Sequence, residues 1–115
     1  MTATLGETLA PYLTEAQMQD AIRTAALRNG WLFYHTHNSR RSDAGFPDCV
    51  CVKDGRMIVF ELKKQSGRVE PKQRAWVNRF ADVPNCTAAI VRPIPKAGEI
   101  SYDQALEMFQ EDGEQ

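Results

Sequence analysis

The chain has 115 residues, of which 43% are hydrophobic and 25% are charged, and its formal net charge is −1. These values indicate one globular domain with a modest core, and without a run of eighteen apolar residues no transmembrane helix is expected. The N-terminus lacks a basic segment followed by an apolar one, so no secretory signal is expected. The three cysteines form an odd set, and Cys49 and Cys51 are too close along one strand for a natural disulfide, which favours a reducing cytoplasm.

Helical and extended patterns follow one another along the chain. Residues 1–11 are expected to form a loose arm. Thr14 and Gln17 have the spacing of a capping box, which starts a helix that Gly30 ends. Further on, the patterns predict strands over 31–35, 49–53, 56–60 and 87–91, and helices over 71–80 and 101–111. This order predicts an α/β fold in which helices flank a mixed four-stranded sheet.

The short apolar hairpin around Asp54-Gly55 is the most informative segment. Asp-Gly between β-forming residues is a strong signal for a two-residue type I′ turn. Such a turn pairs Lys53 with Arg56, and the same register followed back along both strands places Asp48 opposite Glu61. The Cβ atoms of such a pair lie roughly 4.5–5.5 Å apart. The sequence therefore predicts two carboxylates side by side on one face of the sheet.

Two carboxylates this close repel each other, so positive charge is needed nearby. Because side chains alternate between faces along a strand, Lys63 shares the face of Asp48 and Glu61. A divalent cation would offset the remaining repulsion, and carboxylate oxygens suit Mg²⁺ or Mn²⁺. Such a set is what metal-dependent cleavage of a phosphodiester bond requires. The alternative is a solvated charge cluster at the open end of a hairpin.

Helical periodicity adds two polar residues to this set. Gln73 is the polar member of an otherwise apolar helix face, and a buried Gln needs hydrogen-bond partners that the carboxylates or their waters can supply. Glu15 begins a similar stripe in the first helix, where the alternative is an acid favoured by the helix dipole. The apolar members of the two stripes are Trp76, Val77 and Phe80, and Met18, Ile22 and Ala26.

Charge is distributed unevenly along the chain. Residues 40–80 hold ten Lys or Arg and five acids, whereas residues 81–115 hold two bases and seven acids. A basic middle beside an acidic end suggests one face for a polyanion, and chance clustering on solvated surfaces is the alternative. The candidates for phosphate contacts are Arg40, Arg41, Lys64, Arg68 and Lys72, with Ser39 and Ser66 as hydroxyl donors.

A zinc site is a further alternative, because His35, His37, Cys49 and Cys51 could supply four ligands. In the predicted register, however, both cysteines lie mid-strand and face away from the carboxylates. They are therefore expected to be small buried hydrophobic residues, and zinc is disfavoured. The chain has no Gly-rich phosphate loop, so no nucleotide cofactor is expected.

Four short motifs occur in an order that resembles the VRR-NUC nucleases, a branch of the PD-(D/E)xK superfamily. The motifs are Glu15-Ala16-Gln17-Met18-Gln19, Gly45-Phe46-Pro47-Asp48, Glu61-Leu62-Lys63 and Gln73-Arg74. The resemblance covers residues 14–92, which leaves 1–13 as an N-terminal arm and 93–115 as an acidic C-terminal helix of the same domain. It implies a restriction-endonuclease-like αβββαβ core, and the small size resembles stand-alone members from phages or prophages.

The resemblance also implies an activity and roles for single residues. Lys63 would orient or activate the attacking water, and Gln73 would be the helix-borne polar residue of the site. The metal ligands would be Asp48, Glu61, the main-chain carbonyl of Leu62 and, for a second metal, Glu15. The implied activity is cleavage of DNA by a homodimer that uses Mg²⁺ or Mn²⁺, particularly at four-way (Holliday) junctions. A flap- or nick-type nuclease, a restriction-type nuclease and a non-catalytic DNA-binding subunit with the same fold are the alternatives.

Overall fold

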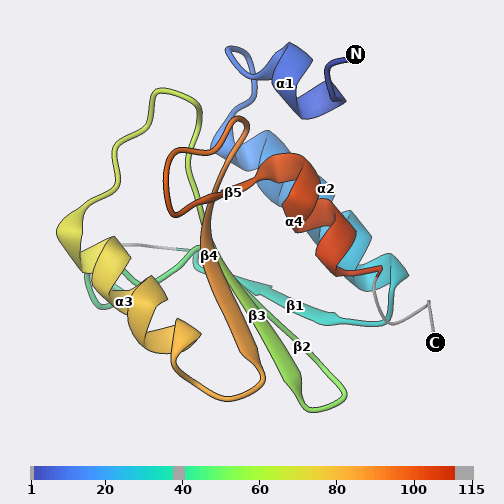
Figure 1. The fold of residues 1–115 in the computed structure, drawn as a ribbon. Coiled ribbons are helices and arrows are strands. Elements are labelled where there is room, and N and C mark those ends of the chain that lie inside the picture. Colours follow the sequence, from blue (N-terminus) through green and yellow to red (C-terminus); the bar gives the residue numbers. More distant parts are fainter. Residues whose placement is uncertain (1, 38–40, 111–115) are drawn as a thin grey trace.

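The computed structural model describes residues 2–37 and 41–110 as one five-stranded sheet with helices on both faces (Figure 1). The strands, β1 to β5 in order across the sheet, are Leu32–His35, Cys49–Lys53, Arg56–Leu62, Cys86–Arg92 and Ile100–Ser101. The helices, α1 to α4, are Leu5–Leu9, Glu15–Arg28, Pro71–Ala81 and Tyr102–Met108. The β1–β2 and β2–β3 pairs are antiparallel, whereas β3–β4 and β4–β5 are parallel. The α/β class and the mixed sheet predicted from the sequence are confirmed.

The hairpin of β2 and β3 has the predicted register. Pairing runs from Lys53 and Arg56 beside the turn to Cys49 and Phe60 at the open end. Both turn residues have positive φ, 49° and 79°, as a type I′ turn requires. The two turn residues therefore predict the register of the whole hairpin correctly.

The helices begin where their caps predict. In α2, Thr14 Oγ1 accepts from the Gln17 main-chain nitrogen at 3.1 Å, and Gln17 Oε1 accepts from the Thr14 nitrogen at 3.0 Å. Helix α3 begins at Pro71, whose missing N–H costs nothing at the first helical position. Ser101 is the N-cap of α4 and forms a capping box with Gln104, so this helix begins at Tyr102.

The main hydrophobic core lies between the sheet and the α2–α4 pair, and α3 covers β3 and β4 on the other face (Figure 1). Its members include Met18, Ile22 and Ala26 of α2, Cys49 and Cys51 of β2, Phe60 and Leu62 of β3, and Ala105 and Phe109. Both strand cysteines are fully buried, which confirms that they are core residues. Alternation then turns Val59 and Glu61 toward the α3 face.

Three local features differ from the expectations. Strand β5 was not predicted, because two residues are too short for any periodic pattern. The N-terminal arm contains helix α1, which has its own capping box and packs its buried Gly6 against Tyr102 and Asp103. Helix α4 ends at Met108, short of the predicted residue 111, which lies outside the described residues. None of the helices in the described part of the chain has the length and apolar character needed to cross a membrane.

Candidate active site

Asp48 and Glu61 meet at the open end of the hairpin. Asp48 immediately precedes β2, and the Leu62 main-chain nitrogen donates to Asp48 Oδ2 at 2.8 Å, which fixes this carboxylate beside the end of β3. Glu61 is the penultimate residue of β3, and its Oε2 lies 3.6 Å from Lys63 Nζ. The structure thus brings together the three charged side chains that the register and strand alternation predict on one face.

The charges of this cluster are buried. Glu61 is only 3% exposed and Lys63 only 8%. Burial, with repulsion from Asp48, raises the pKa of Glu61 to about 8, although the Lys63 charge acts in the opposite direction. Burial also raises the pKa of Asp48, against the lowering effect of the hydrogen bond from Leu62. Lys63 alone therefore does not compensate the two carboxylates.

One acceptor in the cluster is unsatisfied. Glu61 Oε1 is buried and accepts no hydrogen bond from any group in the described part of the chain. An ionised carboxylate in this position is costly unless it is paired or binds a metal. The donor set therefore fits a divalent cation.

The ligands that would hold such a cation are few. Within residues 2–37 and 41–110, no group of three or more His, Cys, Asp or Glu side chains is arranged to hold a metal ion. Mg²⁺ commonly uses only one or two carboxylates and completes its shell with waters and phosphate oxygens. Asp48 and Glu61 would be those carboxylates. The Leu62 carbonyl would be the main-chain ligand, because within a strand it faces the same side as the N–H that reaches Asp48.

A cavity of about 270 Å³ opens beside the carboxylates, and Asp48, Glu61, Gln73, Thr36 and His37 are among the residues that line it. Gln73 Oε1 accepts from the Glu70 main-chain nitrogen at 2.9 Å, so its oxygen caps the start of α3. The amide nitrogen of Gln73 is then the end that can donate to a group in the cavity. A larger hollow of about 510 Å³ lies at the turn end of the hairpin, away from the buried carboxylates.

The loop before Asp48 is held against α3. Trp76 Nε1 donates to the Ala44 carbonyl at 3.2 Å, and the Phe46 and Trp76 rings pack edge to face with centroids 5.1 Å apart. Gly45 has a φ of +86°, and a Cβ atom there would lie 2.6 Å from the Lys72 carbonyl carbon. Only glycine fits this close approach, which aligns the segment leading into the site.

Other predicted site residues lie at the margin. Glu15 is the exposed first residue of α2; its charge contributes to raising the pKa of both carboxyls, but it does not line the cavity. His37 lines the cavity, and its ring lies 4.1 Å from that of His35. The candidate phosphate contacts Arg41, Lys64, Arg68 and Lys72 are exposed, whereas Arg40 and Ser39 lie outside the described residues.

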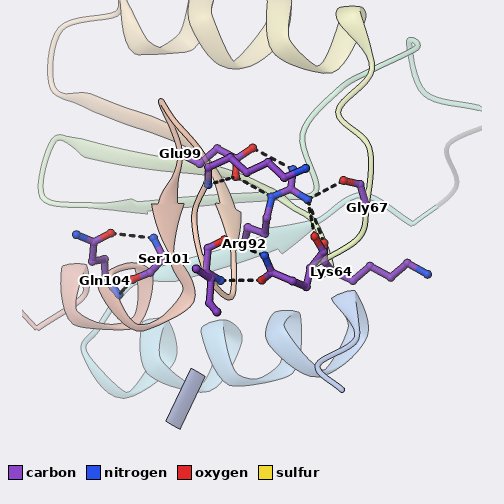
Figure 2. A network of polar contacts seen from close by, with 9 residues as sticks. Lys64, Gly67, Arg92, Glu99, Ser101 and Gln104 are labelled. Carbon is purple, nitrogen blue, oxygen red and sulfur yellow. Dashed lines mark hydrogen bonds and ion pairs between the residues drawn. The ribbon is translucent and has the colours of Figure 1, made fainter. Parts of the chain in front are cut away.

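Sequence reasoning missed Arg92, which is only 1% exposed. Its Nε donates to Glu99 Oε1 at 2.7 Å and its Nη2 donates to Oε2 at 3.0 Å. Its Nη1 donates to the carbonyls of Lys64, Gln65 and Gly67 at 3.2, 3.1 and 2.6 Å. Figure 2 shows Arg92 between Glu99 and the turn formed by residues 64–67. Arg92 therefore anchors the turn that directly follows Lys63.

Fold and site together define a mixed α/β domain with a buried cluster of two carboxylates and one lysine at the end of a hairpin. No family model matches the sequence, and no curated protein matches it. A solved structure described as "VRR_NUC domain" matches with a TM-score of 0.59 and 18% identity, covering 84% of this chain and 94% of that chain. The chain therefore has the fold of a VRR-NUC domain, which the sequence motifs predicted.

Proposed function

We propose that this protein is a divalent-cation-dependent DNA endonuclease that hydrolyses phosphodiester bonds. The observation that carries the proposal is the buried Asp48–Glu61–Lys63 cluster, whose Glu61 Oε1 has no partner among the described residues. Asp48 and Glu61 of this cluster line the cavity of about 270 Å³, and the likeness to a VRR_NUC domain supports the same chemistry.

A bound Mg²⁺ or Mn²⁺ supplies Lewis-acid polarisation of the phosphate and lowers the pKa of a water molecule. Asp48 and Glu61 are the side chains that would hold the cation. Lys63 Nζ lies 3.6 Å from Glu61 Oε2, where its ammonium would stabilise developing negative charge and orient the attacking water. The Gln73 amide donates to the water or to a phosphate oxygen.

The substrate that we propose is branched DNA, particularly a four-way junction, cut by a homodimer. A two-fold dimer places two identical sites on opposing strands, which symmetric cutting of a junction requires. Support comes from the sequence motifs and from the exposed apolar side chains of the β1–β2 face. Leu32 is 71% exposed, Tyr34 57% and Val52 37%. A second copy of the chain would cover this face.

The test is incubation with labelled four-way junction, flap, nicked and plain duplex DNA, with Mg²⁺ or Mn²⁺ and with EDTA. Paired symmetric cuts in the junction alone support a resolvase, and cuts at a flap or nick support the corresponding nuclease. If none of these substrates is cut in a metal-dependent way, the nuclease proposal is overturned. A non-catalytic DNA-binding subunit is then the remaining interpretation. Light scattering checks the homodimer separately.

Lys63→Ala is the most informative variant in this assay. We expect it to abolish cleavage while DNA binding remains nearly unchanged, because Lys63 acts on the reacting groups. Lys53→Ala is a matched control, since Lys53 lies on the same hairpin at its opposite end, where its Nζ donates to the Asn29 carbonyl. Full activity of Lys63→Ala would remove this lysine from the mechanism.

A further inference from the structure

A second hollow, of about 430 Å³, lies beside the turn that follows Lys63. Its lining contains four basic side chains and one acid, namely Arg68, Arg74, Arg92, Lys96 and Glu99. Arg92 and Glu99 compensate each other in a fully buried pair, with side-chain exposures of 1% and 2%. The lining therefore carries a net charge of +3 from the other three bases, although the Arg74 charge also helps to lower the pKa of Glu99.

These three bases come from three different parts of the fold. Arg68 follows the turn after β3, Arg74 lies in the first turns of α3, and Lys96 lies in the loop between β4 and β5. Among the described residues, none of the three head groups has a hydrogen bond or an ion pair within 4.0 Å. Like charges that converge in this way repel one another, and an anion would relieve the repulsion.

The main chain around the hollow is held in place by hydrogen bonds. Arg92 holds three carbonyls of the 64–67 turn, and Glu99 Oε1 accepts from the Lys96 main-chain nitrogen at 2.9 Å (Figure 2). Two of the segments that carry the bases are thus tied to one buried ion pair. Ser66 lines the same hollow and offers a hydroxyl donor. Guanidinium, ammonium and hydroxyl donors in a fixed concavity are the chemistry that recognises a phosphate group.

We propose that this basic hollow, defined by Arg68, Arg74 and Lys96, binds a phosphate group of the DNA other than the one that is cleaved. The inference rests on the proposed function and deepens it. The turn that forms one wall of the hollow begins directly after Lys63. A DNA strand that is bound at the hollow is therefore positioned relative to the cleavage site. The phosphate is either an internal backbone group or the terminal group at a nick or strand end.

The experiment measures DNA binding by fluorescence anisotropy in EDTA, so that it does not depend on cleavage. The variant is Arg74→Gln/Lys96→Gln, and the matched control is Arg23→Gln/Arg28→Gln, which removes two exposed cations from α2. We expect roughly tenfold weaker binding for the variant, and a slope of log K against log salt that is shallower by about 1. The control should remain within about twofold of the wild type, because surface charges outside a contact contribute little.

Two DNA substrates distinguish the sources of the phosphate. Both are nicked duplexes, one with a 5′-phosphate and the other with a 5′-hydroxyl at the nick. Equal weakening on both supports an internal phosphate, and loss of a preference for the phosphorylated nick supports a terminal one. If the variant kept the wild-type affinity and salt slope, the proposal that the hollow binds a phosphate would be overturned, and the nuclease proposal would remain intact. A wild-type protein that neither binds nor cleaves DNA would overturn both.

Discussion

The buried carboxylate of Glu61 should make the metal-free protein less stable at high pH. Its pKa rises from 4.5 to about 8 on folding, so the folded state takes up a proton that the unfolded state lacks between these two values. The contribution of Glu61 to stability is then greatest below pH 4.5, falls as the pH rises toward 8, and stays at its lower value above. At about 1.4 kcal/mol per pKa unit, the free energy of unfolding falls by about 5 kcal/mol over the whole range. About 3 kcal/mol of this has already been lost at pH 7.

Glu61→Gln removes this loss, because the amide stays neutral at every pH. In EDTA we expect the variant to be more stable than the wild type by about 3 kcal/mol at pH 7 and by about 5 kcal/mol at pH 9, with little difference at pH 4. Urea denaturation followed by tryptophan fluorescence measures this difference. Glu107→Gln is the control, since this exposed residue of α4 should change stability by less than about 0.5 kcal/mol.

Mn²⁺ should close most of the difference in stability between these two proteins at pH 7. A cation bound only by the folded state at 100 times its dissociation constant adds about 2.7 kcal/mol, and the variant lacks one of the two carboxylates. Parallel pH profiles of wild type and Glu61→Gln in EDTA would refute the reasoning, because Glu61 would then titrate as a solvated acid does.

Three further substitutions test other parts of the structure. Arg92→Met should cost about 3–5 kcal/mol in urea denaturation because Glu99 is left buried and unpaired, and Arg92→Met/Glu99→Met should recover most of that loss. Gly45→Ala should lower the free energy of unfolding by about 1–3 kcal/mol and reduce cleavage, because the loop must move off α3 and shift Asp48. Unchanged stability and cleavage would contradict the close approach of Gly45 to the Lys72 backbone. Gln73→Glu keeps the oxygen that caps α3 but replaces the amide donor with a third carboxylate beside Asp48 and Glu61, so cleavage should fall at least tenfold.

The sequence predicts this site well where local chemistry determines the structure. The Asp54-Gly55 turn sets the hairpin register by itself, and the register determines which residue faces Glu61. Strand alternation then places Lys63 on the face of Glu61, and helical spacing places Gln73 on the inward stripe of α3. These steps need no knowledge of contacts between distant segments.

Other features depend on contacts that no local pattern encodes. Arg92 is the last residue of an apolar strand, where its sequence pattern is that of an ordinary surface residue. It is buried because the β4–β5 loop brings Glu99 back to it and the 64–67 turn offers carbonyls. Gln73 follows Glu70 at capping-box spacing, a signal that could have predicted its bond to the helix start. Glu15 begins an apolar stripe as predicted, but lies outside the cavity because the stripe turns inward only at Met18.

Calorimetric titration of Mn²⁺ tests most directly whether the paired carboxylates form a cation site. With a Glu61 pKa of about 8, the metal-free site is largely protonated at pH 7, so binding should release close to one proton and the heat should depend on the buffer. We predict such binding for the wild type and at least tenfold weaker binding for Asp48→Asn. Absence of Mn²⁺ binding by the wild type, or equal affinity in Asp48→Asn, would contradict the account.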